Sequence, residues 1–304
     1  MSRAMASLST TELTLGLRAL FPSATRVEVA GRTATSRASS FSAEVVRCRV
    51  DADELRLFCK FGEPDLREPG SHRRGLAYES FVYESVLVWH RPRHLGWFTV
   101  GRAECLVLEY LDGARSLRVC GFDDYVRAAR WLGRFHRRHT DLRANGLTVY
   151  GPDMFERWID RLVGHRDAPD VPWVIDAAHR LSRLLPPLAD APMTLLHGEY
   201  FPGNIMLAGA DVRPVDWETA GFGAGLLDLA ALTWGWHAPY CRELVRAYDE
   251  ERTGCREVGT PADRLIAARA LVVAQSLAET RTWRTSGASQ ALEYLLHLLG
   301  RVGP

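Results

Sequence analysis

Residues 195–228 constrain the fold and the chemistry of this chain more than any other stretch. The first of two acidic motifs contains the letters HGE, ending at Glu199, with Asn204 five residues later, and the second contains DWE, beginning at Asp216. An apolar run precedes the first motif, another follows it at 205–208, and the small or polar residues 209–211 are typical of a turn. The pattern predicts a strand, a loop, a hairpin and a second strand, which can bring Glu199, Asn204 and Asp216 together.

The convergence of a carboxylate with an Asn and an Asp is what phosphoryl transfer requires of a protein. One group positions the attacking hydroxyl, and the other two hold Mg²⁺ against nucleotide phosphates with hard oxygen ligands. We therefore expect Glu199 and Asp216 to be catalytic residues, and Asn204 and Asp216 to be the Mg²⁺ ligands. Each motif alone has a structural alternative, because a lone Asp between strands is more often a turn former than a metal ligand.

The two motifs resemble the catalytic and metal-binding segments of the aminoglycoside phosphotransferase family, small-molecule kinases with a protein-kinase-like fold. That family has His-Gly-Asp, then Asn at the same spacing, then Asp-Trp-Glu. This chain departs at Glu199, where the family has the Asp that accepts the substrate proton. The resemblance implies a bilobal α+β fold: an N-terminal antiparallel sheet lobe (1–108) that binds nucleotide, a hinge (109–113), and a larger, mainly helical lobe (114–304) for catalysis and acceptor binding.

Composition excludes several other classes of protein. With 304 residues, of which 47% are hydrophobic, the chain can bury a sizeable core, and its net charge of +1 provides no global field for nucleic acid or an anionic membrane. No signal-peptide core or charge-free apolar run of about 18 residues occurs. The six scattered cysteines suggest neither a zinc site nor a redox pair, and they suit a reducing compartment. We expect a soluble cytoplasmic protein.

The single lysine of the chain is its most informative basic residue. Lys and Arg total 38, and only Lys60 is a lysine. A lysine ammonium is a compact point charge and guanidinium is a wide planar fork, so a lysine kept in an arginine-rich chain marks a site where Arg would not fit. Lys60 lies in a predicted third strand, 55–62, where the resemblance places the lysine that contacts nucleotide phosphates. The alternative is an ordinary strand lysine.

A buried lysine of this kind needs a carboxylate to hold it, and the predicted helix 74–90 offers two. Helical periodicity places Glu79 within the apolar stripe, where it requires a cationic partner, whereas Glu84 lies nearer the edge of that stripe. Glu79 also begins a Glu-three-residue-Tyr pattern that resembles the family's. We therefore expect Glu79 to orient Lys60.

Two further nucleotide contacts are expected in the N-terminal lobe. The hydroxyl-rich turn between the first two predicted strands places Ser39 and Ser40 where they could bind phosphates, although the turn lacks several glycines and a plain hairpin loop is an equal alternative. The resemblance assigns residues 109–113 to the hinge, whose backbone pairs with the adenine edge. It thereby implies that Glu109 and Leu111 bind the nucleotide through main-chain groups.

The remaining pattern is largely helical. Helical periodicity or turn residues predict helices at 8–21 (N-cap Thr10 or Thr11), 122–139, 152–163, 173–185, 238–251, 262–281 and 287–300. We interpret His136, near the end of the second of these helices, as a satisfied core residue. Asp228 opens a short apolar helix.

The acceptor is expected to be a small molecule. Only eleven residues separate Asp216 from Asp228, too few for the long activation segment that docks peptides in protein kinases. An aromatic-rich set in the later helices could build the pocket: Trp158, Trp173, Trp234, Trp236, His237, Tyr240 and Trp283. Balanced charge after Gly113 favours a neutral sugar-like, nucleoside-like or macrolide-like hydroxyl over an aminoglycoside polycation.

The sequence thus predicts an ATP- or GTP-dependent O-phosphotransferase that requires Mg²⁺ and acts on a small-molecule hydroxyl, such as that of a nucleoside, macrolide or aminoglycoside antibiotic. Two alternatives remain open. Glu199 in place of the family's Asp is compatible with a scaffold that binds nucleotide but does not catalyse phosphate transfer. Retention of Asn204 and Asp216 is also compatible with an AMP transferase.

Overall fold

The computed structural model describes residues 8–35, 41–63, 72–87, 92–140, 145–164, 172–189, 191–252, 262–279 and 286–301. The chain forms two compact units. The first unit comprises Met1–Arg115 and Met206–Thr219, and the second comprises Ser116–Ile205 and Ala220–Pro304.

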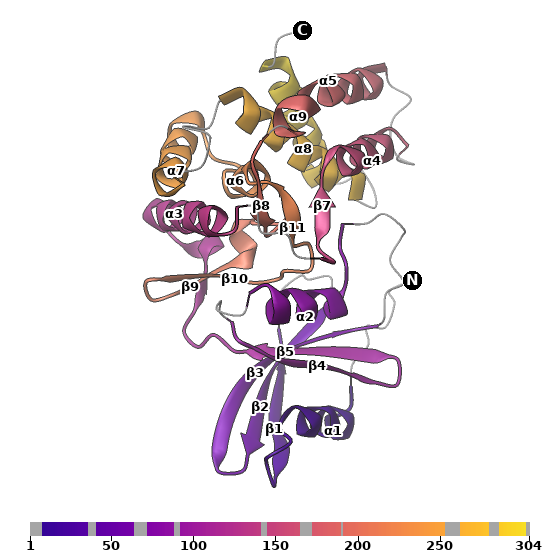
Figure 1. Ribbon diagram of the computed structural model, residues 1–304, viewed down its shortest axis with the longest axis vertical. Coiled ribbons are helices and arrows are strands. Elements are labelled where there is room, and N and C mark those ends of the chain that lie inside the picture. The colour runs from indigo at the N-terminus through magenta and orange to yellow at the C-terminus, as the bar shows by residue number, and fades with distance from the viewer. Residues whose placement is uncertain are drawn as a thin grey trace. The chain divides into compact units, whose positions relative to one another are not determined.

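The first unit is built on a five-stranded antiparallel sheet with the order β1-β2-β3-β5-β4 (Figure 1). Its strands are β1 (Val27–Ala34), β2 (Ser42–Val50), β3 (Asp53–Gly62), β4 (His94–Val100) and β5 (Ala103–Glu109), and its helices are α1 (Thr10–Leu20) and α2 (Leu76–Ser85). The hairpin of β9 (Ile205–Ala208) and β10 (Asp211–Pro214) follows later in the chain. The antiparallel sheet expected in the N-terminal part is confirmed.

Helix α1 has a different N-cap from the one that the sequence suggested. The N-cap is Ser9 and not Thr10 or Thr11: the Ser9 hydroxyl accepts from the Glu12 N–H, and the Glu12 side chain accepts from the Ser9 N–H. The reason is the reciprocal capping box, which satisfies two backbone donors at once and requires a Glu three residues after the cap. Neither threonine has one.

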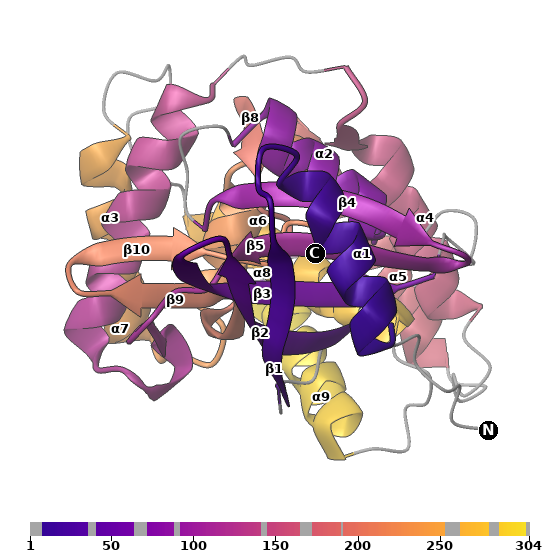
Figure 2. The same ribbon diagram turned by 90° about the horizontal axis from the view of Figure 1, so that it is seen from below.

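Side-chain alternation along β3 decides which way Lys60 points. Leu57, Cys59 and Phe61 lie in the apolar core that α1 completes on one face of the sheet. Successive side chains on a strand point to opposite faces, so Lys60 projects from the other face, toward α2. Figures 1 and 2 show α1 and α2 on opposite sides of this sheet.

The second unit is mainly helical. Its helices are α3 (Phe122–Arg138), α4 (Pro152–Val163), α5 (Pro172–Ala189), α6 (Leu226–Leu232), α7 (Ala238–Glu251), α8 (Ala262–Glu279) and α9 (Ser286–Arg301), with single 3₁₀ turns at Leu117–Val119 and Pro202–Asn204. Strands β7 (Thr148–Tyr150), β11 (Gly221–Ala224) and β8 (Met193–Leu196) form a small sheet in that order, and the short strand β6 spans Arg115–Ser116. With the sheet of the first unit, these helices give the α+β class expected from the sequence.

Helix α5 differs from its expected extent. The sequence suggested an end at 185, before Pro186 and Pro187, but the helix continues to Ala189. A proline inside a helix removes a backbone hydrogen bond and crowds the preceding turn. Here both prolines fall in the final turn, so the two bonds that their missing N–H groups cost lie at the end of the helix.

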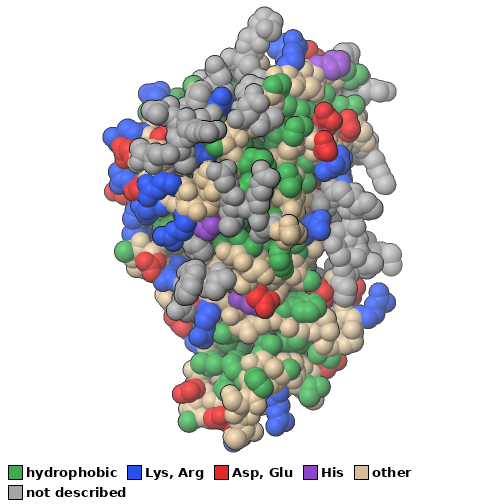
Figure 3. All heavy atoms as spheres, viewed as in Figure 1, with side chains coloured by type: hydrophobic (Ala, Val, Ile, Leu, Met, Phe, Trp, Pro, Cys, Tyr) green, Lys and Arg blue, Asp and Glu red, His purple; other side chains and the backbone are tan. Residues whose placement is uncertain are grey.

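Helices α3 and α7 pack closely against each other. A Cβ added to Gly133 would lie 2.3 Å from the Tyr248 carbonyl oxygen, so the contact requires glycine. Ion pairs Arg130–Glu250 and Arg134–Glu251 bridge the same two helices, and basic and acidic side chains mix over them on the left of Figure 3. Among the helices that the structure describes, none is long and apolar enough to cross a membrane.

Candidate active site

Lys60 lies between two carboxylates in the first unit. Its Nζ donates to Oε1 and Oε2 of Glu79 at 2.9 and 2.7 Å, and to Oδ1 of Asp216 at 2.6 Å. Lys60 and Glu79 are both buried, whereas Glu84, the rival on α2, is exposed. Strand β3, helix α2 and the segment after β10 each contribute one member of this cluster, which we call the lysine cluster.

The backbone after β10 is anchored to the start of α2. The Trp217 N–H donates to Oε1 of Glu79 at 3.2 Å. Glu218 is fully buried and accepts from Arg73 Nη1 at 3.0 Å, while its carbonyl accepts from the Arg74 N–H at 3.1 Å. Glu218, the last residue of the DWE motif, is therefore engaged by an arginine.

Electrostatics in the lysine cluster are dominated by one cation and two carboxylates. Burial alone would lower the pKa of Lys60, but the charges of Asp216 and Glu79 outweigh it and raise that pKa, so the lysine stays charged. Burial raises the pKa of Glu79, as do the nearby charges of Asp216 and Glu218, while Lys60 opposes them. The lysine cluster carries an excess of negative charge that a further cation would offset.

Asp216 has a strained backbone. Its φ is 73°, and Asp51 is the other non-glycine residue with positive φ among those described. This left-handed conformation costs an L-residue about 1 kcal/mol, and such strain is found at sites where function requires a particular side-chain direction. Its side chain is 17% exposed, so a ligand can reach the carboxylate.

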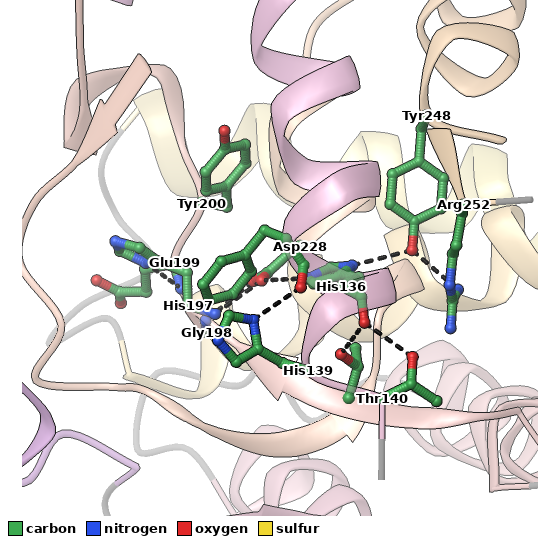
Figure 4. A network of polar contacts seen from close by, with 12 residues as sticks. His136, His139, Thr140, His197, Gly198, Glu199, Tyr200, Asp228, Tyr248 and Arg252 are labelled. Atoms are coloured by element: carbon green, nitrogen blue, oxygen red, sulfur yellow. Dashed lines mark hydrogen bonds and ion pairs between the residues drawn. The ribbon is translucent and has the colours of Figure 1, made fainter. Parts of the chain in front are cut away.

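The HGE motif in the second unit forms a loop held by a buried carboxylate (Figure 4). Asp228 accepts from the His197 N–H at 2.7 Å and from the Gly198 N–H at 2.9 Å. Gly198 has a φ of 86°, a conformation that favours glycine. Residues 197–201 are called the catalytic loop below, and Asp228 on α6 fixes their backbone.

Glu199 and Asn204 are brought together within this unit. The Asn204 side-chain amide donates to the Glu199 carbonyl at 3.1 Å, and the Glu199 N–H donates to Nδ1 of the buried His197 at 3.3 Å. Since the amide nitrogen of Asn204 is engaged, its Oδ1 is the atom left to bind a cation. Glu199 itself is 8% exposed.

Two further nucleotide contacts were expected, from the serines of the first turn and from the main chain of the hinge. Ser39 and Ser40 lie outside the described residues. The Glu109 N–H already donates to the Arg93 carbonyl at 2.9 Å, and the Leu111 carbonyl accepts from the Ala114 N–H at 3.2 Å. These bonds engage the Glu109 N–H and the Leu111 carbonyl within the protein.

The structure divides the expected aromatic set. Trp158 is fully buried, and the side chains of Trp173 and Trp283 lie outside the described residues. Trp234 is half-buried and meets Phe201 of the catalytic loop edge-on, with ring centroids 5.8 Å apart. A second group of aromatic side chains, on α3 and α7, packs around Trp236. Among the described members of the set, Trp234 contacts the catalytic loop.

The role of Asp228 was not recognised from the sequence beyond its opening α6. It lies thirty residues after the loop that it holds, in a helix whose other residues are apolar. That apolar setting was the available signal, since a fully buried carboxylate must find donors.

The oxygen donors present fit Mg²⁺. Asn204 offers Oδ1 and Asp216 a carboxylate, both hard oxygen ligands. Among the described residues, no group of three or more His, Cys, Asp or Glu side chains forms a protein-only metal site. Mg²⁺ commonly binds to one or two protein oxygens and completes its shell with water and substrate phosphates.

Solved structures have the same fold. A choline kinase from Streptococcus pneumoniae has a TM-score of 0.66 at 13% identity, covering 94% of this chain and 98% of that one. The GDP complex of wild-type aminoglycoside 2'-phosphotransferase-IIIa gives 0.63 at 14%, covering 96% and 99%. A macrolide 2'-phosphotransferase from Brachybacterium faecium gives 0.59 at 18%, covering 95% and 98%. Identities this low establish the fold alone.

Sequence comparison identifies the family. No curated protein matches this sequence. The model of the phosphotransferase enzyme family matches residues 33–263, well over half of the 304-residue chain, and this range contains the lysine cluster and the catalytic loop. The chain therefore belongs to the phosphotransferase enzyme family and has the kinase-like fold of small-molecule kinases.

Proposed function

We propose that the chain transfers the γ-phosphate of ATP or GTP to a hydroxyl group of a small molecule. The observation that carries this proposal is the lysine cluster, in which the only lysine of the chain is buried between Glu79 and Asp216. Solved structures of the same fold contain GDP and AMP, which supports a nucleotide co-substrate.

Each residue has a defined part in this reaction. Lys60 contacts the nucleotide phosphates, Glu79 orients Lys60, and Asn204 and Asp216 hold Mg²⁺. When bound, Mg²⁺ neutralises charge on the phosphates. Main-chain groups of Glu109 and Leu111 bind the adenine edge.

Glu199 accepts the proton of the acceptor hydroxyl. Phosphoryl transfer has a loose transition state, so positioning and charge neutralisation supply most of the rate, and the base supplies less. A Glu in place of the family's Asp is therefore tolerable, provided that the catalytic loop absorbs the extra methylene. The Asn204 bond to the Glu199 carbonyl and the Asp228 bonds to the preceding amides fix the backbone from which this longer side chain extends.

The acceptor is proposed to be neutral and able to stack, as a nucleoside-like, sugar-like or macrolide-like molecule is. Trp234 contacts Phe201 of the catalytic loop and also Tyr294, at 6.0 Å between centroids. Arg269 lies over Tyr294 and donates to the Thr233 carbonyl at 2.7 Å, and within the described part of the chain it has no carboxylate partner. A cation beside these rings disfavours a polycationic aminoglycoside.

The test is a screen of hydroxyl-bearing metabolites and antibiotics with Mg²⁺ and ATP or GTP, read by mass spectrometry of the acceptor. We expect one acceptor to gain the mass of a phosphate. A gain of the mass of AMP would instead establish an AMP transferase. Binding of Mg-nucleotide without turnover of any acceptor would support the scaffold that the Glu199 departure allows.

The stacking part of the proposal has its own variant. Trp234→Ala should raise the KM for the acceptor and leave the KM for nucleotide unchanged. Tyr240→Ala, which truncates an exposed aromatic of the separate group on α7, is the matched control and should leave both values unchanged. Equal effects of the two substitutions would remove Trp234 from the acceptor site.

A further inference from the structure

A series of hydrogen bonds connects the end of α7 with Asp228 inside the second unit (Figure 4). Arg252 Nη1 lies 2.8 Å from the Tyr248 hydroxyl, which lies 2.9 Å from Nδ1 of His136 on α3. Nε2 of His136 lies 3.2 Å from Oδ2 of Asp228. Tyr248, His136 and Asp228 are fully buried, so water does not compete for these bonds.

The direction of each hydrogen bond follows from the chemistry of its groups. A guanidinium only donates, so the Tyr248 oxygen accepts from Arg252 and its own O–H donates to His136 Nδ1. Burial lowers the pKa of His136, against the opposing charge of Asp228, so the ring is neutral. Its one remaining proton is therefore on Nε2 and is donated to Asp228.

Asp228 connects His136 to the backbone of the catalytic loop. Its Oδ2 receives both His136 Nε2 and the His197 N–H, and its Oδ1 receives the Gly198 N–H. A rotation of the carboxylate would lengthen both backbone bonds. Gly198 directly precedes Glu199, so the position of Glu199 depends on the Asp228 carboxylate. His136 is the third hydrogen-bond donor to that carboxylate.

The space around the Tyr248–His136 bond is fully used. A Cβ added to Gly225 would lie 2.7 Å from His136 Nδ1 and 2.7 Å from the Tyr248 hydroxyl oxygen. The close approach at Gly133 fixes the Tyr248 backbone against α3. With the two groups confined in this way, the hydroxyl and the imidazole have little freedom to choose other partners.

Arg252 is more than a packing residue. It is half-buried, and its contacts are the Tyr248 hydroxyl and ring and the Pro192 carbonyl at 3.5 Å. No carboxylate within the described ranges pairs with it. A guanidinium that donates to the Tyr248 oxygen polarises the Tyr248 O–H toward His136, which strengthens that bond.

We propose that Tyr248 and Arg252 are positioning residues for the catalytic loop, acting through His136 and Asp228. They fix the imidazole in its Nε2–H tautomer, and the imidazole fixes the carboxylate that holds the His197 and Gly198 amides. The inference rests on the proposed function for its catalytic meaning. Its structural part is measurable without any acceptor.

The primary test compares Tyr248→Phe with the wild type by amide hydrogen exchange. The substitution keeps the ring and removes the donor to His136. Loss of one hydrogen bond of this kind should speed exchange at the His197 and Gly198 amides about 5- to 10-fold. Amides of α4 serve as the reference and should be unchanged, so uniform acceleration of all amides would show global destabilisation and overturn the proposal, as would unchanged exchange at the loop.

A second pair of variants removes and restores the cation. Arg252→Met should accelerate exchange at the same two amides, and Arg252→Lys, which keeps a charged donor, should recover most of the protection. Arg246→Met is the matched control on the same helix, where it breaks only an exposed pair with Glu250, and it should have no effect at the catalytic loop. Equal acceleration by Arg252→Lys and Arg252→Met would overturn the role of the cation.

Two further measurements separate this inference from the proposed function. Nitrogen-15 spectra of the wild type should show His136 as the Nε2–H tautomer, and an Nδ1–H tautomer would contradict the proposal. With an accepted substrate, Tyr248→Phe should lower kcat about 10-fold while the KM for Mg-ATP stays the same; a rise in KM alone would count against positioning. If the acceptor screen finds no transfer, the proposed function fails while the exchange and tautomer results still decide the structural part.

Discussion

Lys60 Nζ lies 2.6 Å from Oδ1 of Asp216, so the lysine proposed to hold phosphate is bonded directly to the aspartate proposed to hold Mg²⁺. An ammonium has three N–H groups, and here they face Glu79 and Asp216. A phosphate oxygen must therefore displace one of these bonds. We expect Asp216, whose side chain is partly exposed, to give up its bond to Lys60, since Glu79 is fully buried.

Replacing the lysine tests the need for a point charge. Lys60→Arg keeps the positive charge but replaces the compact ammonium, which lies between two carboxylates, with a wider planar guanidinium. We expect kcat/KM to fall about 10-fold or more, roughly 1.4 kcal/mol. Steady-state kinetics with the acceptor from the screen checks this, and an unchanged kcat/KM would mean that the unique lysine has no special role.

The two glutamates of α2 form a matched pair. Glu79→Gln removes the buried charge that holds Lys60, and should lower the free energy of unfolding by about 1–3 kcal/mol and kcat/KM about 10-fold. Glu84→Gln makes the same chemical change on the exposed side and should leave both quantities unchanged. Urea unfolding and steady-state kinetics of the two variants give the comparison; similar losses in both would rule out a specific role for Glu79.

Asp216→Asn tests the proposed Mg²⁺ ligand without changing its size. Asn also tolerates positive φ and can still accept a hydrogen bond from Lys60, so the fold should persist. Loss of the charged ligand should reduce kcat by about 10² or more at saturating Mg²⁺. Activity within about threefold of wild type would remove Asp216 from the reaction.

Glu199 distinguishes an enzyme from a scaffold. If it accepts the hydroxyl proton, Glu199→Gln should lower kcat by about 10² or more with little change in nucleotide affinity, because general-base assistance contributes about 10²–10⁴-fold. Glu199→Asp should be the milder change, since it keeps the carboxylate. A Gln variant that turns over as fast as the wild type would assign Glu199 a structural role.

The buried His136 should make stability depend on pH. Burial lowers its pKa below the ordinary 6.5, against Asp228, while Arg252 and His139 lower it further. The unfolded state then binds more protons than the folded state, so the free energy of unfolding falls as the pH drops below 6.5. Urea unfolding between about pH 7 and pH 5 should show a larger loss of the free energy of unfolding in the wild type than in His136→Asn. Equal losses would refute the lowered pKa of His136.

The parts of this protein that follow local patterns were predictable from its sequence. Alternation along 55–62 and the lone lysine identified Lys60, and helical periodicity preferred Glu79 to Glu84. The role of Asp228 was not predictable, because nothing local indicates which amides a buried carboxylate will hold. The partnership of Tyr248 with His136 likewise depends on two helices meeting, which no single-helix pattern encodes.

The chain order of the first unit has a consequence for synthesis. Residues Met206–Thr219 belong to that unit although segments of the second unit precede and follow them. The ribosome releases Lys60 and Glu79 long before Asp216 and Trp217, so the nascent sheet holds its lysine with one carboxylate until the later segment arrives. A chain terminated early therefore carries the lysine without its second carboxylate, and translation must pass residue 219 before the lysine cluster can exist.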